Sequence, residues 1–355
     1  ICLVGSEMCI RDRFQQPQVD VRLADNISRG ATLFALGLFK KMVLADTLAG
    51  IANPAFLLAE QGQSMTLVDA WVGALAYTFQ LYFDFSGYSD MALGLAIMFG
   101  ISLPLNFYSP YKARSIIDFW RRWHMTLSRF LRDYVYIPLG GNRHGKLRRF
   151  GNLLITMLLG GLWHGAGWTF VIWGGLHGLF LIINHGWRNI VERTGSSALR
   201  GITSWVATPL TFFCVVIAWV YFRSPTLAGA HTMLAGMFDP TLPGDQSLGL
   251  STALLSQVMD FPLSLVLAPL VEQPKAVAVY LMLLFAGGIA LLMPNVVELM
   301  GDKHPALRQT IPVPESAQHK WGWTPSLPWA IATALLLFLC VSAASVLSPF
   351  VYFQF

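Results

Sequence analysis

One histidine of this 355-residue chain lies in a setting where an ionisable ring is costly. His164 stands in the stretch GGLWHGAG, and no charged residue occurs from Phe150 to Trp187. Ionisable groups inside a membrane are expensive and tend to mark functional sites. Because the ring titrates near neutral pH, it can take a proton from a reacting hydroxyl group. The sequence alone leaves a catalytic and a hydrogen-bonded structural role for His164 equally open.

A second candidate for acid–base chemistry is His124, which ends the stretch RRWH. Two arginines and a tryptophan are also typical of an anchor at a membrane interface. His124 precedes His164 by 40 positions, so only the tertiary fold can bring the two rings together. For His177, in GGLHG, we favour a structural role. The remaining histidines are interpreted as neighbours of a span or as solvated loop residues: His144, His185, His231, His304 and His319.

Two aspartates also fall in an apolar part of the chain. Asp84 and Asp90 lie in FDFSGYSD, where paired carboxylates could bind an ion or exchange protons. The same stretch also fits a break between two helices, with Ser86 or Ser89 capping the second helix and Gly87 permitting the turn. We favour this structural interpretation.

The composition is that of a membrane protein with many spans. Hydrophobic residues make up 55% of the chain and charged residues only 12%, against about 25% charged in a typical soluble domain. Of the 24 Lys and Arg, 10 fall between Lys112 and Arg149, which indicates a cytoplasmic face. Nothing resembles a nucleic-acid-binding module, so we expect no nucleic acid partner. The four cysteines show no ligand spacing, and we expect neither disulfides nor a metal site.

The apolar stretches that must position these residues number roughly eight or nine. Residues 31–58 contain Lys40 and Lys41, which predicts either a span with snorkelling lysines or a broken helix. Residues 116–135 mix charges and aromatics at helical spacing, which predicts one amphipathic helix that lies at the interface or packs into the mouth of a cavity. The glycine-rich residues 151–185 are too long for one straight span and predict a re-entrant segment followed by a span. The other expected spans are 66–84, 88–103, 204–222, 278–298, 328–347 and the less regular 248–271, and the expected polar loops are 223–247 and 301–326.

Several long motifs, taken together and in order, resemble the membrane-bound O-acyltransferase family, in particular its alginate O-acetyltransferase branch. The main motifs are DFWRRWHMTLSRFLRDYVYIPLGGNRHG and GGLWHGAGWTFVIWGGLHG, flanked by GLFKKMVLAD, YFDFSGYSDMALGLAIMFG, LNFYSPY, WVYFRS and PFVYFQF. The resemblance covers 14–355 and implies one all-α, polytopic transmembrane helical bundle around a central funnel or tunnel, with re-entrant and interfacial helices. It implies that His164 is catalytic and that His124 is the second functional histidine.

The resemblance also implies a reaction. An acetyl group would pass from a cytoplasmic thioester, acetyl-CoA or another acyl thioester, toward hydroxyls of an alginate-like exopolysaccharide outside, with no bound cofactor. His164 would act as the general base, and oxyanion donors could come from Trp163, Asn152 or backbone N–H groups near Gly165. The expected location is the bacterial inner membrane, and the expected partners are membrane lipid and a periplasmic acetyltransferase.

Two other kinds of function stay open. The same motifs suit D-alanyl transfer to teichoic acid or O-acetylation of peptidoglycan. Outside enzymology, the intramembrane aspartates and histidines could belong to an ion-coupled transporter.

The first residues differ from everything that follows. Residues 1–13, ICLVGSEMCIRDR, lack an initiator methionine and the charged start of a signal peptide. They resemble translated adaptor sequence. Our hypothesis is that they are not native and that the chain lacks the N-terminal spans of the family.

Overall fold

The described part of the protein is built from helices that suit a membrane. In the computed structural model no strand occurs in the described residues, and four helices are long and apolar enough to cross a bilayer. These four helical stretches are Leu23–Glu60, Trp168–Thr194, Trp205–Arg223 and Pro274–Leu291. The expected all-α, multi-span architecture is confirmed. The structure describes residues 23–101, 103–240, 250–258, 269–271, 273–300 and 322–343, without the side chains of 198–200 and 202–204.

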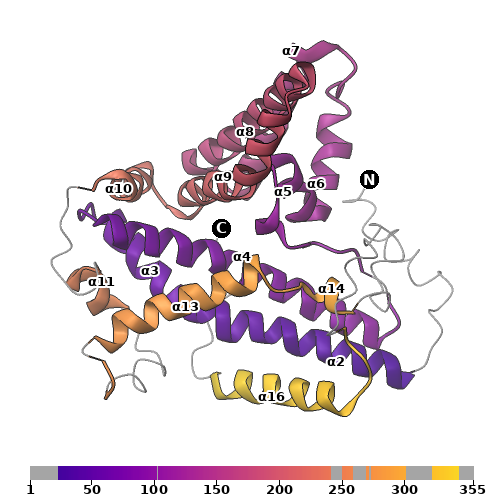
Figure 1. Ribbon diagram of the computed structural model, residues 1–355, viewed down its shortest axis with the longest axis vertical. Helices are drawn as coiled ribbons and strands as arrows, with labels where there is room; N and C mark the ends of the chain where they lie inside the picture. Colours follow the sequence, from indigo (N-terminus) through magenta and orange to yellow (C-terminus); the bar gives the residue numbers. More distant parts are fainter. Residues whose placement is uncertain are drawn as a thin grey trace.

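The helices fall into two groups (Figure 1). Long helices α2, α3, α4, α13 and α16 form one group across the lower part of the view, and α7, α8 and α9 form the other above it. Helix α9 packs on α4 and on α8, so it joins the two groups. The bounds of the first group are α2 (Leu23–Phe39), η1 (Lys40–Ala45), α3 (Asp46–Glu60), α4 (Leu67–Met98), α13 (Pro274–Leu291), α14 (Val296–Met300) and α16 (Leu327–Ala343). Those of the rest are η2 (Pro110–Lys112), α5 (Ile116–Arg122), α6 (Met125–Leu131), η3 (Arg132–Tyr136), α7 (Gly145–His164), α8 (Trp168–Thr194), α9 (Ser197–Arg223), α10 (Leu227–Phe238) and α11 (Thr252–Gln257).

The first long stretch, Leu23–Glu60, is continuous, and the π-helical segment η1 sits between α2 and α3. Its lysines do not snorkel to the membrane surface as one interpretation predicted. Lys40 Nζ lies 2.6 Å from Asp90 and Lys41 Nζ lies 2.7 Å from Asp84, both on α4. The lysines therefore pair with carboxylates inside the bundle, which removes the need to reach water.

The two spans expected at 66–84 and 88–103 are one helix, α4, and the predicted break at FSGYSD is wrong. Gly87 permits close helix packing instead of a turn. A Cβ at Gly87 would lie 2.7 Å from the Gly37 carbonyl oxygen of α2, and one at Gly94 would lie 2.6 Å from that of Gly30. Small residues let membrane helices approach closely. Two glycines on each helix therefore seat α2 against α4.

The single amphipathic helix expected over 116–135 is also wrong. The chain forms α5, breaks at Trp123 and His124, resumes as α6, and ends in the π-helical η3. His124 has φ 39°, in the left-handed region that a helix cannot contain. The residues of this stretch keep helical periodicity, but the break at His124 interrupts the helix.

The interruption predicted within 151–185 is confirmed. Helix α7 ends at His164, the chain turns through Gly165 and Gly167, and α8 returns along α7 as the second arm of a hairpin (Figure 1). A Cβ on Gly161 would collide with the Phe170 carbonyl oxygen, so this glycine permits the two arms to touch. The basic residues Lys146, Arg148 and Arg149 form the first turns of α7.

The remaining expectations have mixed outcomes. The span at 204–222 is confirmed within α9, 328–347 coincides over its described part with α16, and 278–298 is divided into α13 and α14. The expectation that 223–247 is a polar loop is wrong, because Leu227–Phe238 forms the apolar helix α10. Of the less regular span expected at 248–271, the structure describes only 250–258 and 269–271. Of the polar loop expected at 301–326, it describes only 322–326. Residues 1–13, His304 and His319 lie outside the described residues.

Candidate functional site

His124 and His164 line the same cavity. The cavity is small, about 10 Å³, which is room for about one water molecule. Its wall is almost wholly apolar and aromatic, so a reaction there would proceed with little water present. The other lining residues are Leu81, Phe85, Trp120, Trp123, Leu127, Trp173, Trp219 and Phe222.

His164 reaches the cavity because it is the last residue of α7. Its ring is packed edge to face against Trp173 of α8 and Phe222 of α9, with centroid distances of 5.2 and 5.0 Å. The hairpin of α7 and α8 therefore surrounds the His164 ring on two sides, and α9 packs against it on a third side. Aromatic contacts on several sides limit the rotation of the imidazole.

His124 reaches the cavity from the break between α5 and α6. Two backbone hydrogen bonds hold this break against the segment before η2: Tyr108 N–H donates to the Arg122 carbonyl and Met125 N–H donates to the Asn106 carbonyl, both at 3.0 Å. Phe85 of α4 meets the ring of His124 edge to face at 4.8 Å. A non-glycine residue held at positive φ by its surroundings is a feature that clusters at functional sites.

His177 lies outside the cavity, behind its aromatic wall. It is fully buried, and its Nδ1 accepts a hydrogen bond of 3.3 Å from the Trp120 indole N–H. Its ring also meets Trp173 at a centroid distance of 5.0 Å. This position fits the structural interpretation, because His177 holds two tryptophans that line the cavity.

The suggested oxyanion donors lie at different distances from His164. Asn152 lies 12 residues before His164 on α7, about 18 Å away along the axis, and its amide donates to the Gly141 carbonyl. Trp163 contacts the His164 ring at a centroid distance of 5.0 Å but is 57% exposed and absent from the cavity wall. Asn152 is thus too distant to assist at His164, and backbone N–H groups at the turn remain the nearer candidates.

A larger cavity, about 630 Å³ in volume, adjoins the first one and is lined by basic side chains. Trp120 contributes to the walls of both cavities. The sequence did not reveal this cavity, because its arginines belong to a basic cluster that indicates only topology. The basic side chains of its wall are Arg121, Arg129, Arg132, Arg149 and His185.

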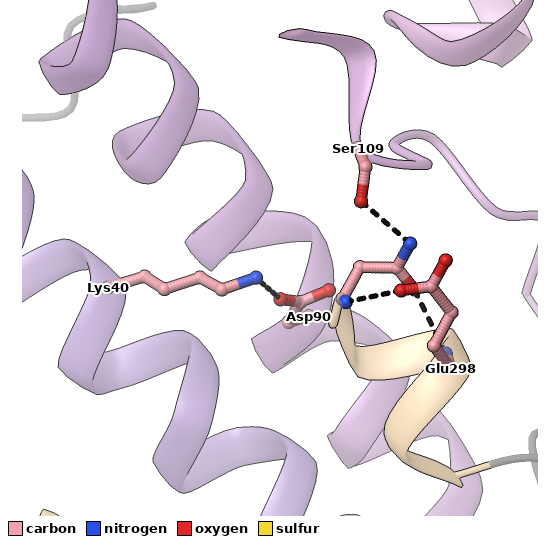
Figure 2. Close-up of polar contacts among 5 residues, drawn as sticks. Lys40, Asp90, Ser109 and Glu298 are labelled. Carbon is pink, nitrogen blue, oxygen red and sulfur yellow. Dashed lines mark hydrogen bonds and ion pairs between the residues drawn. The ribbon is translucent and has the colours of Figure 1, made fainter. Parts of the chain in front are cut away.

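The two aspartates of the apolar stretch, Asp84 and Asp90, form ion pairs between helices. Asp84 is 1% exposed and Asp90 is 3% exposed, and both face lysines of η1. Figure 2 shows Lys40 reaching across from its helix to Asp90. The structural role that we favoured is supported, but its physical basis is ion pairing between helices and not the capping of a helix break.

Helix α14 is tied to the segment before η2. Asn295 Nδ2 donates to Ser109 Oγ at 2.8 Å, and Asn295 and Glu298 cap each other's backbone N–H groups (Figure 2). Ser109 is buried and has φ 44°. These bonds fix the end of the segment that also holds His124.

The other histidines of the described residues lie outside the cavity of His124 and His164. His144 and His231 are exposed as expected, although His231 lies on α10 and not in a loop. Over the described ranges, no three His, Cys, Asp or Glu side chains gather as metal ligands would.

Comparison with known proteins gives one family and several close relatives. The family model described as "MBOAT, membrane-bound O-acyltransferase family" matches residues 2–223. A "Peptidoglycan O-acetyltransferase" of Helicobacter pylori is 49% identical over 212 residues, 60% of this chain and 39% of that protein. A "Probable alginate O-acetylase AlgI" of Azotobacter vinelandii is 40% identical over 365 residues, 99% of this chain and 67% of that protein. A "Teichoic acid D-alanyltransferase" of Streptococcus thermophilus is 32% identical over 191 residues, 50% of this chain and 46% of that protein. The chain thus spans less than half the length of the Helicobacter protein and two thirds of the Azotobacter protein.

Proposed function

The chain belongs to the membrane-bound O-acyltransferase family, and we propose that it transfers an acetyl group from a cytoplasmic thioester toward hydroxyls of a polysaccharide outside the membrane. The observation that carries the proposal is the shared cavity of His124 and His164. Two acid–base groups meet there from separate elements, inside an apolar wall.

The chemistry follows from these two rings. A hydroxyl oxygen attacks the thioester carbonyl carbon, so a C–O bond forms and the C–S bond breaks. His164 takes the hydroxyl proton as general base, and the protonated ring then gives this proton to the leaving thiolate. His124, in the same cavity, orients the reactants or assists the proton transfer. General-base catalysis of this kind is worth about 10²–10⁴-fold in rate.

The basic cavity is the proposed place for the donor. Arginine pairs well with phosphate, and about 630 Å³ is a usual size for a small-molecule site. A phosphate-bearing thioester such as acetyl-CoA would place its anionic part among Arg129, Arg132 and Arg149. Its acyl end would then approach Trp120 and the histidines beyond. The donor is a substrate, and the proposal requires no bound cofactor or metal.

The positive residues at the start of α7 support a cytoplasmic position for this cavity, because short basic connections stay inside. Asn142 and Arg149 belong both to this region and to the cavity wall. In a bacterium the membrane would be the inner membrane, and a periplasmic acetyltransferase would receive the acetyl group there. The exposed apolar side chains of α16, such as Leu335 and Phe338, would face lipid.

For the acceptor we propose an alginate-like exopolysaccharide, since the Azotobacter relative matches 99% of this chain. Peptidoglycan is the second candidate, because the Helicobacter relative reaches 49% identity over a shorter region. D-alanyl transfer to teichoic acid has weaker support, with 32% identity over half of the chain. Ion-coupled transport loses support, since Asp84 and Asp90 are engaged by lysines.

The test is to express the chain in strains that lack their own alginate or peptidoglycan O-acetylation enzyme. Restored ester-linked acetate on alginate alone is the expected result. Restored acetate on peptidoglycan alone would move the assignment to the second candidate. Membrane insertion with no acetate on either polymer, while a full-length relative restores it, would contradict the proposed function for this chain.

A further inference from the structure

Asn106, in the motif LNFYSPY, contacts the helix break at His124 with its backbone and His124 itself with its side chain. Its backbone carbonyl accepts from Met125 N–H at 3.0 Å. Its side-chain Oδ1 lies 3.3 Å from Thr126 N, 2.7 Å from Thr126 Oγ1 and 3.3 Å from His124 Nδ1. The buried neighbours Leu105 and Phe107 fix the segment on either side.

The orientation of the Asn106 amide follows from its partners. A backbone N–H can only donate, so the amide atom that faces Thr126 N must be the oxygen and not the NH₂ group. The Thr126 hydroxyl then also donates to this oxygen, at the short distance of 2.7 Å. Both contacts from Thr126 agree on one orientation.

This orientation decides which nitrogen of His124 carries the proton. Oδ1 has no hydrogen to give, so the contact with Nδ1 is a hydrogen bond only when Nδ1 is protonated. The Thr126 hydroxyl also lies 3.4 Å from Nδ1, but its single proton is committed to the much closer Oδ1. In the neutral ring, Nε2 is then the atom with a lone pair.

We propose that Asn106 is a positioning residue that holds the proton of His124 on Nδ1 and leaves Nε2 as the nitrogen through which His124 assists the proton transfer. A histidine ring acts as a base through one nitrogen, and a hydrogen bond to the other nitrogen selects which one. The positive φ of His124 and the bonds from Asn106 together set the ring position. The inference rests on the proposed acyl transfer for its activity test but not for its spectroscopic test.

The activity test compares two substitutions at this position. Asn106→Leu keeps the approximate volume but removes the acceptor, and it should lower kcat about 10-fold or more, since the wrong tautomer is costly elsewhere by up to about 10⁴-fold. Asn106→Asp keeps an acceptor and should retain most of the activity. Its carboxylate stabilises the protonated ring, so the acid limb of the pH–rate profile should move to higher pH by about one unit.

The matched control is Asn53→Asp, which adds the same charge at an exposed residue of α3. It should leave the acid limb where it is. His164 is the other histidine of the cavity and is unchanged in all variants. A shift of the acid limb that is seen only with Asn106→Asp is therefore assigned to His124, which lies next to residue 106. An unshifted limb in Asn106→Asp, or full activity in Asn106→Leu, would overturn the inference.

The spectroscopic test uses the whole chain in detergent with ¹⁵N-labelled histidine. The His124 signal, identified by its loss in His124→Gln, should show a protonated Nδ1 and an unprotonated Nε2 at neutral pH. The opposite tautomer would refute the inference even if the Leu variant fails to fold. If no acetyl transfer is found in any form, the proposed function fails while the tautomer result still decides the role of Asn106.

Discussion

Replacing Lys41 by methionine should destabilise the bundle strongly. Lys41 Nζ lies 2.7 Å from carboxylate oxygens of both Asp46 and Asp84, and the Lys41 side chain is only 7% exposed. At 2.7 Å and an effective dielectric constant of about 20, one such pair is worth about 6 kcal/mol of Coulomb energy before desolvation. Removing one partner of a buried pair typically costs about 3–5 kcal/mol, because the remaining charge stays buried. We expect a loss in this range for Lys41→Met.

A double-mutant cycle with Asp84→Asn isolates the pair. The double variant should be less destabilised than the sum of the single variants by at least about 1 kcal/mol, since groups in direct contact are coupled. The assay is reversible unfolding in detergent, followed by circular dichroism. Arg29→Met is the control on α2, because Arg29 and Asp25 form a more exposed pair at 3.8 Å and should contribute about 1 kcal/mol or less. Additive single effects, or equal losses for Lys41→Met and Arg29→Met, would refute the proposed inter-helix role.

Three further outcomes follow from the structure. Gly161→Ala should lower the amount of folded protein in the membrane, because the added methyl meets the Phe170 carbonyl oxygen. Gly186→Ala, where a methyl would meet open space, is the control and should not lower it. Equal levels of the two variants on a membrane immunoblot would contradict this packing. Arg149→Gln should raise KM for acetyl-CoA about 10-fold with little change in kcat, because the variant loses one charged contact to phosphate. An unchanged KM would show that the donor does not bind in the basic cavity. A cysteine in place of the exposed Asn142 should resist a membrane-impermeant thiol reagent in intact cells and react after lysis, and rapid labelling of intact cells would reverse the topology.

The sequence predicted the fold class and the interrupted segment at 151–185 because these depend on composition and glycine position. It mispredicted α4 because FSGYSD contains the residue types that cap and break helices. In the structure Gly87 is pressed against α2, and the two aspartates find lysines 50 and 43 positions earlier in the chain. Those partners belong to another helix, so local pattern could not reveal them.

The candidate site also contains features that the sequence predicts and features that only the tertiary fold reveals. Both His124 and His164 were singled out from residue type, setting and family resemblance, but only the fold brings them to one cavity. The helix break at His124 was hidden, since the residues around it keep helical periodicity. Asn106 gave no signal, because an asparagine beside a proline-rich turn is ordinary in a loop. The basic cavity was missed because its arginines come from separate helices.

We propose that His164 performs the proton transfer of an acyl transfer, and a comparison of two rates tests this role. Purified wild-type protein and His164→Ala, matched for folded amount by thermal unfolding, are assayed for release of free thiol from acetyl-CoA in the presence of acceptor polysaccharide. His231→Ala, the same change at an exposed histidine of α10, is the control. We expect a rate about 10²–10⁴-fold lower for His164→Ala and an unchanged rate for the control. A folded His164→Ala protein that works within twofold of the wild-type rate, on the order of experimental error, would contradict the account.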